Sequence, residues 1–462
     1  MKELKKLSNP GALAIQSNGR IVVAGATASC FPAPDCSGSK ILVERLRWNG
    51  SLDPSFGGGD GIVTLPTTGI GFKVKGLAIR PDGRIVLAGG SYDPNGATAI
   101  LQLNPDGKVD GTFGTNGYVV FPSVALSYGT GSARALGLDP QGRILLAGVR
   151  NFHFAVVRLL PDGDIDNSFG VDGFASISFG DGGHLATAVK ALSDGRVLVA
   201  GQVDGVPTPG TSSVGVAMLT QEGDLDPSFG GGSGMTTVTT ESSLEVNSPL
   251  ALPTAILTGR GHQIVIASAQ GERFDSCPRS FALSALTLDG APDPSFGGGD
   301  TVSGPGTCIT AGDADLARDG DVVAVGARAL DVTLPTSIAV ARYTHSGSND
   351  VTFGPKGLRL LRVDGFSSGA NVVRALRRGR VLVAGSADAS KRSCSRALNG
   401  KLFRCRAVVL MRFLPNGKLD SSFGGDGVVS TPRFTQCADK SKCRKWRTEM
   451  ESNETGPEGV HR

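Results

Sequence analysis

Seven aspartates recur beside Gly-rich backbone, and such carboxylates can bind cations or act as acids and bases. Each stands three residues before a Phe-Gly step, as in "LDPSFGGGDG" (52–61), "VDGTFGTNG" (109–117) and "IDNSFGVDG" (165–173). The recurring aspartates are Asp53, Asp110, Asp166, Asp226, Asp293, Asp350 and Asp420. They would form either a ligand site that is repeated seven times or the structural turn of a repeating architecture.

The structural interpretation is favoured, because ligand sites need convergent groups and these copies point to seven separate places. The spacing also lacks the alternating oxygens of a calcium loop, and "PDGDIDNS" (161–168), with Asp162, Asp164 and Asp166, lacks the twelve-residue pattern. We expect the Asp to bond backbone amides in an Asx-type turn. The Phe would fill the gap between adjacent repeats.

Other residue types that often act in catalysis show no catalytic pattern in this sequence. The five histidines, 153, 184, 262, 345 and 461, share no motif. No Gly-Lys-Ser or Gly-Lys-Thr step follows the Gly-rich loops, and no Gly-x-Ser-x-Gly elbow occurs. The sequence therefore predicts no catalytic residue, no metal site and no cofactor.

An arginine recurs after the first tight turn of the repeat. Its five copies are Arg20, Arg84, Arg143, Arg196 and Arg380. A ring of arginines could bind anions, but pairing with a neighbouring turn aspartate is favoured, because such pairs are common.

The elements that position these residues are short strands joined by tight turns. Gly (67) and Pro (25) make up about a fifth of the 462 residues, which suits this architecture. In the second unit, "VKGLAIRP" and "RIVLAGG" flank one Asp-Gly step, and "TAILQLNP" and the Phe-Gly segment flank another, before "YVVFP". The Asp-Gly steps predict type I′ hairpin turns. Each unit thus contains four strands, A to D.

Seven such units predict an all-β fold, a seven-bladed β-propeller of four-stranded antiparallel blades. We expect an N-terminal extension over 1–8, the propeller over 9–432 and a charged, Cys-containing tail over 433–462. The predicted blades are about 9–66, 73–122, 132–179, 185–240, 252–303, 311–363 and 370–432. The ring should be closed and the protein a monomer.

The repeat, with its "DGRIVLAG" hairpin and its Asp-x-x-Phe-Gly loop, resembles the bacterial delta-60 repeat and, more distantly, the NHL propeller repeat. The resemblance covers about residues 9–432. It implies the propeller fold and no shared catalytic motif. Units five and six depart from the pattern, because the arginine after the first turn is missing there.

All eight cysteines fall in segments that a meander places on one face, in B–C loops, a D–A linker and the tail. An even count and local spacing predict disulfides, hence an oxidising compartment. The expected pairs are Cys30 with Cys36, Cys277 with Cys308, Cys394 with Cys405, and Cys437 with Cys443. Zinc sites are the rival interpretation, but Cys-x₂-Cys spacing is missing.

Charge is distributed unevenly along the chain. Residues 371–447 contain 18 Lys and Arg against 4 Asp, a net of +14, whereas the whole chain has +4. This block predicts either a solvated chain end or a docking patch for an anionic polymer or surface. The candidate ligand-binding residues are Arg392, Arg396, Lys401, Arg404, Arg406, Lys440, Lys442, Arg444, Lys445 and Arg447.

These patterns predict a secreted or cell-envelope binding or scaffold module without catalysis. Its partner would be an anionic polysaccharide, an envelope surface or another protein. Nucleic acid is not expected, because few aromatics accompany the basic residues. No apolar run reaches membrane-helix length, and no leader is recognisable at the start. The alternative is a hydrolase or lyase with a site at the mouth of the central channel, where convergent acidic or His residues would be required.

Overall fold

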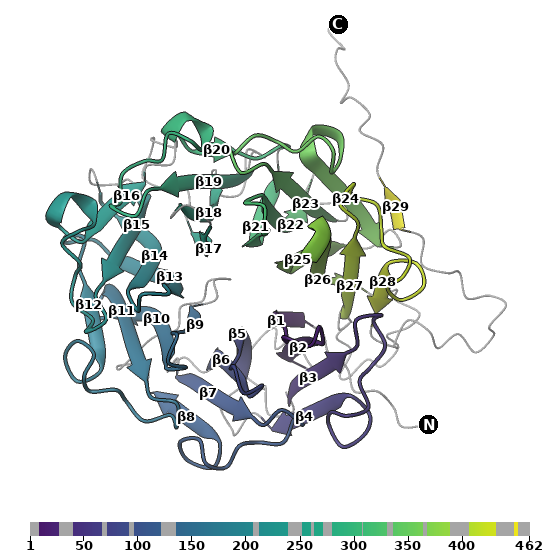
Figure 1. The fold of residues 1–462 in the computed structure, drawn as a ribbon, viewed down its shortest axis with the longest axis horizontal. Helices are drawn as coiled ribbons and strands as arrows, with labels where there is room; N and C mark the ends of the chain where they lie inside the picture. The colour runs from purple at the N-terminus through teal and green to yellow at the C-terminus, as the bar shows by residue number, and fades with distance from the viewer. Residues whose placement is uncertain are drawn as a thin grey trace, which may run out of the picture.

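The computed structural model describes residues 9–26, 40–66, 72–91, 97–121, 135–206, 212–238, 252–259, 263–270, 280–306, 308–329, 336–363, 367–388, 406–430 and 448–450. Within these residues the chain forms seven antiparallel sheets arranged radially around a common centre (Figure 1). A cavity at this centre, lined mainly by the first strands of blades two to six, is here called the channel. The predicted seven-bladed β-propeller is confirmed. No helix of the described residues is long and apolar enough to cross a membrane.

Each blade is a meander whose strands A to D follow chain order. The first blade contains β1 (Asn9–Ile15), β2 (Ile21–Ala26), β3 (Lys40–Leu46) and β4 (Ile62–Pro66). The second contains β5 (Phe72–Ile79), β6 (Ile85–Ser91), β7 (Thr98–Leu103) and β8 (Tyr118–Phe121). The third contains β9 (Leu136–Leu138), β10 (Ile144–Arg150), β11 (His153–Leu159) and β12 (Phe174–Ile177). The fourth contains β13 (His184–Ala191), β14 (Val197–Asp204), β15 (Ser212–Leu219) and β16 (Met235–Val238).

The last three blades keep this order. The fifth contains β17 (Pro253–Thr258), β18 (Ile264–Gln270), β19 (Ser280–Leu286) and β20 (Val302–Ser303). The sixth contains β21 (Ile309–Leu316), β22 (Val322–Arg328), β23 (Ser337–Tyr343) and β24 (Leu358–Val363). The seventh contains β25 (Ser368–Ala375), β26 (Val381–Asp388), β27 (Arg406–Phe413) and β28 (Val428–Ser430). Short 3₁₀ turns are η1 (Gly230–Gly232), η2 (Gly297–Gly299), η3 (Pro355–Gly357) and η4 (Arg377–Gly379).

Blade six carries an additional outer strand from the tail. β29 (Thr448–Met450) pairs antiparallel with β24, so that Thr448 lies opposite Val363 and Met450 opposite Leu361. An outermost strand presents unpaired N–H and C=O groups, which a further strand can satisfy. The sequence pattern gave no sign of this strand.

The hairpins differ in one respect from the prediction. In the A–B turn of blade two the N–H of Gly83 donates to Arg80 O (2.9 Å) and that of Arg80 to Arg84 O (2.9 Å). Of the three residues between the two arginines only Gly83 has a positive φ, +86°. This is a type I turn followed by a left-handed glycine, so the predicted type I′ turn is wrong here. The reason is loop length, because type I′ turns join strands through two residues.

Strand A lines the channel, and in six blades its pairing with strand B is interrupted by a β-bulge among the described residues. The bulged positions contact the next blade. The Oγ1 of Thr187 donates to Pro253 O (2.9 Å), and the Nδ2 of Asn371 donates to Pro10 O (3.2 Å). The bulges therefore form a ring of contacts around the channel.

Blades one and seven close the ring without exchanging a strand, because each builds its sheet from its own repeat. Leu13 and Leu42 of blade one pack with Val372 and Leu382 of blade seven in one buried cluster. The N–H of Gly424 also donates to Asn49 O across this junction (3.0 Å). Closure therefore depends on side-chain packing and backbone hydrogen bonds between the two blades.

The meander gives the ring two different faces. The turn face carries the A–B turns and the C–D loops. The loop face carries the B–C loops and the D–A linkers. This follows from the strand order, because successive strands of a meander run in opposite directions.

Candidate functional site

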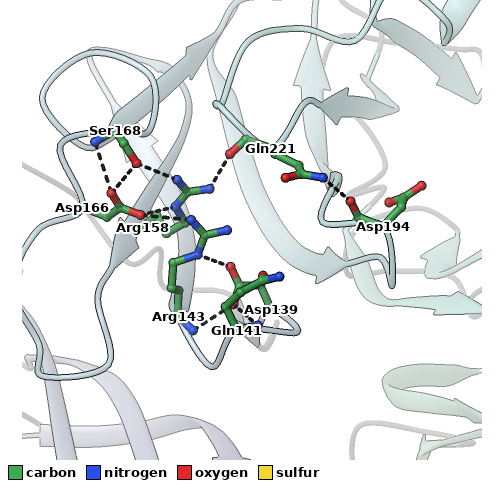
Figure 2. Close-up of polar contacts among 8 residues, drawn as sticks. All are labelled: Asp139, Gln141, Arg143, Arg158, Asp166, Ser168, Asp194 and Gln221. Atoms are coloured by element: carbon green, nitrogen blue, oxygen red, sulfur yellow. Dashed lines mark hydrogen bonds and ion pairs between the residues drawn. The ribbon is translucent and has the colours of Figure 1, made fainter.

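The repeated C–D loop is built around a buried aspartate, as blade three shows (Figure 2). The Oδ1 of Asp166 accepts hydrogen bonds from the backbone N–H (3.1 Å) and hydroxyl (2.6 Å) of Ser168. Its Oδ2 accepts one from the Nε of Arg158 on strand C (2.7 Å). Burial opposes ionisation, but the Ser168 donors and Arg158 together lower the pKa of Asp166. The carboxylate is therefore charged and fully engaged.

Arg158 links this loop to the next blade. One of its guanidinium N–H groups donates to Gln221 O of blade four, and the guanidinium lies 4.5 Å from the ring centroid of Phe169. Arginines at the equivalent position of blades one, six and seven make the same contact with the carbonyls of Pro105, Pro415 and Trp48. The motif thus joins neighbouring blades.

The recurring arginine after the A–B turn belongs to the same network. Arg143 pairs with Asp139 of its own turn (2.5 Å) and reaches Asp166 (3.4 Å). Arg84 pairs with Asp82 (2.5 Å) and with Asp110 (3.0 Å). The predicted pairing with turn aspartates is confirmed, and these guanidinium groups do not form a free ring for anions.

The recurring Phe fills the junction between blades. All seven copies are fully buried: Phe56, Phe113, Phe169, Phe229, Phe296, Phe353 and Phe423. Phe113 packs beneath Gly163 in the C–D turn of blade three, where an added Cβ would lie 3.0 Å from the ring. The N–H of Gly114 then donates to Asp162 O across the junction (2.7 Å). The repeated loop holds the blades together, as predicted.

The channel has a volume of about 550 Å³. Its wall consists mainly of Gly, Ala, Val, Leu, Ile and Thr from the A strands of blades two to six. The charged residues that line it are Lys190, Asp313, Asp315, Arg318 and Arg374. No histidine is among its described lining residues, so the wall combines small and apolar side chains with five charged ones.

The two aspartates of the channel are held by blade seven. The Oδ2 of Asp313 accepts hydrogen bonds from Val373 N (2.9 Å) and Arg374 Nη1 (3.1 Å), and that of Asp315 accepts one from Ala375 N (2.8 Å). Burial raises the pKa of Asp315, and Arg374 opposes this shift. This pair was not predicted from the sequence, although "AGDADLARDG" places two aspartates where other A strands have apolar residues.

Most residues of the predicted basic site lie outside the described residues. These are Arg392, Arg396, Lys401, Arg404, Lys440, Lys442, Arg444, Lys445 and Arg447. The backbone of Arg406 begins β27, paired with Asp388 at the end of β26. The site therefore remains a proposal.

Most of the cysteines in the predicted disulfides also lie outside the described residues. Cys308, directly before β21, is disulfide-bonded. Its expected partner Cys277 lies outside the described residues, as do Cys30, Cys36, Cys394, Cys405, Cys437 and Cys443. The four pairings stay predictions. Among the residues that the structure describes, no group of three or more His, Cys, Asp or Glu could hold a metal ion.

Fold and loops together define a repeat-built, seven-bladed β-propeller. Four segments, residues 16–56, 80–113, 140–169 and 192–229, match the family described as "Domain of unknown function (DUF5122) beta-propeller". No curated protein matches the sequence.

Solved structures resemble the chain at low identity. Prolyl oligopeptidase B from Galerina marginata has a TM-score of 0.44 at 10% identity, over 96% of this chain and 52% of that one, so the chain spans about half its length. The polysaccharide lyase Uly1 has a TM-score of 0.44 at 10% identity, over 88% and 93%. A polysaccharide lyase of family PL25, an ulvan lyase, has a TM-score of 0.44 at 12% identity, over 96% and 99%.

Proposed function

We propose that the protein is a secreted or cell-envelope binding module, made of delta-60-type repeats, that docks on an anionic polymer or surface through blade seven. The observation that carries this proposal is the concentration of charge in residues 371–447, where 12 of the 18 Lys and Arg lie in residues 389–406 and 431–447 with a single Asp. The basic part of this region, here called the basic patch, comprises the B–C loop of blade seven, 389–405, with Arg406, and the tail segment 431–447.

The described ends of these segments support a common location. β26 ends at Asp388 and β27 begins at Arg406, so the B–C loop leaves and re-enters on the loop face. β28 ends on this face at Ser430, and β29 begins beside Val363, at the loop-face end of β24. Basic residues of both segments can therefore act on the same ligand, and disulfides there would restrict their movement.

A binding role also fits the chemistry of the described residues. The loop aspartates accept hydrogen bonds in Asx turns and pair with arginines, except that Asp293 pairs with Gln263. A loop carboxylate whose pKa is lowered in this way is a poor general base, because the donors stabilise its charged form.

Retention on an anionic matrix across a salt series tests the proposal. Replacing Arg392, Arg396, Arg404 and Arg406 with Ser should abolish retention at low salt while the melting temperature is kept. The variant loses retention because four positive charges are removed, and retention of the wild type should weaken as salt is added, since the Debye length falls from about 10 Å at 0.1 M to about 3 Å at 1 M. Equal retention of both proteins would mean that the charges only solvate the chain.

The matched control removes four positive charges from the turn face. Arg377, Arg378 and Lys418 are exposed, and the exposed Lys108 pairs with its neighbour Asp106. Changing these four to Ser should leave retention almost unchanged. Arg84 and Arg143 are unsuitable controls, because both pair with buried aspartates of the C–D loops.

A second candidate is a hydrolase or lyase acting in the channel. It is favoured by the Asp315 carboxyl with its raised pKa, beside Arg374 in the 550 Å³ cavity. Release of shortened chains from the bound polymer, lost in Asp315→Asn, would establish this function in place of pure binding.

A further inference from the structure

The B–C turn of blade three has an unusual sequence for its conformation. Only Asn151 and Phe152 join β10 to β11, because Arg150 pairs with His153. Both residues are left-handed, with φ of 51° and 64°. Such a two-residue type I′ turn normally has glycine at its second central position. A bulky residue with positive φ is an outlier, so Phe152 strains the turn.

The Phe152 side chain contributes little to the fold, since it is 77% exposed. Its carbonyl accepts the N–H of His184 (2.9 Å), which holds the turn against blade four. This backbone contact does not require an aromatic side chain. Strained residues of this kind concentrate at ligand-binding sites.

Phe152 borders a cavity of about 380 Å³ between blades three and four, on the loop face. Asn151, His153, Ser178, Asp181 and the linker 180–183 line the rest of it. The linker is fixed, because His184 Nε2 donates to Gly180 O (3.1 Å) and Asp204 N donates to Gly183 O (3.2 Å). A site held in this way needs little ordering when a ligand binds.

We propose that this cavity, here called the blade-three pocket, binds a neutral saccharide. A sugar ring has a face rich in C–H groups and an edge of hydroxyls. The exposed ring of Phe152 can stack against the C–H face, since aromatic side chains offer large apolar contact area. Asn151, Ser178, Asp181 and the glycine backbone supply donors and acceptors for the hydroxyls. The volume falls within the range of small-molecule pockets, about 300–1,000 Å³.

The charge of the pocket lining favours a neutral saccharide over an anionic ligand. Asp181 is the only residue of fixed charge among the described residues that line the pocket. It disfavours phosphate, sulfate and carboxylate groups. Arg150, the basic residue next to the turn, lies over the ring of Phe174 at 4.6 Å. The blade-three pocket therefore selects a different ligand from the basic patch.

Phe152→Gly provides the critical test, because it removes the ring and relieves the strain together. Wild type and variant are applied to an array of neutral oligosaccharides of glucose, galactose, mannose and N-acetylglucosamine, with sulfated and uronic-acid oligosaccharides alongside. Wild type should bind at least one neutral oligosaccharide, confirmed by titration calorimetry. The variant should lose about tenfold or more in affinity, equivalent to about 1.4 kcal/mol, while its melting temperature stays equal or rises.

Val171→Ser is the matched control, because Val171 is 76% exposed on the turn face of the same blade. It should bind as wild type does. Three outcomes would overturn the proposal: no binding of wild type to any neutral oligosaccharide, binding only to the anionic ones, or equal affinity of wild type and Phe152→Gly.

Discussion

Glu44 makes the junction of blades one and seven sensitive to pH. It lies on β3 between Leu42 and Leu46, on the same strand face, and both leucines belong to the buried cluster shared with blade seven. Glu44 is only 8% exposed. Burial raises its pKa from 4.5 to about 7. An ionised carboxylate in this apolar junction is therefore costly.

The magnitude follows from the pKa difference between the folded and unfolded chain. One pKa unit is worth about 1.4 kcal/mol, so the difference from 4.5 to about 7 is worth about 3 kcal/mol. The folded pKa is the higher one. The contribution of Glu44 to stability is therefore complete below pH 4.5 and is lost as the pH rises through 7.

Glu44→Gln removes this titration. The free energy of unfolding of the variant, relative to wild type, should increase by about 3 kcal/mol between pH 4.5 and pH 8. Urea unfolding followed by circular dichroism at several pH values measures it, and any constant effect of the amide cancels in the comparison. Glu44→Met should behave alike, since Met411 holds the equivalent position in blade seven. A difference between wild type and Glu44→Gln that is constant from pH 4.5 to pH 8 would refute the reasoning.

Two further predictions concern the loops between blades. Phe113→Ala should reduce the free energy of unfolding by about 3–5 kcal/mol, because the ring is fully buried; a loss below about 1 kcal/mol would return the loops to the candidate ligand sites. Asp166→Asn should cost about 3 kcal/mol in the same urea assay, because the buried Arg158 loses its counter-charge. The exposed Asp224→Asn in the next blade should change stability by no more than about 0.5 kcal/mol, and equal losses in both variants would contradict the role given to Asp166.

The parts of the fold that repeat could be predicted from the sequence. The Asp, Phe and Gly positions recur because each junction between blades makes the same demands on geometry. The burial of Phe113 and the pairing of Arg84 with Asp82 followed from that recurrence.

Features that occur once, or that recur at the same position with varying residue types, could not be predicted from the sequence. The bulged positions of strand A are as different as Gly11, Thr187 and Asn371, because backbone geometry and not side-chain chemistry defines them. The channel cluster of Asp313, Asp315 and Arg374 joins two blades and has no local spacing. The Asn-Phe pair at 151–152 can be read from the sequence. Its backbone strain can be inferred only when the loop is known to have two residues.

The C–D loops of the turn face hold the ring together, and we propose that the loop face of blade seven binds the ligand. Amide hydrogen exchange of the full chain, with and without an anionic polymer such as polyphosphate, tests both parts together. We expect slower exchange in peptides from 389–406 and 431–447, and unchanged exchange in the C–D loops such as 419–427. Protection of the C–D loops, with the basic peptides unchanged, would contradict the proposal.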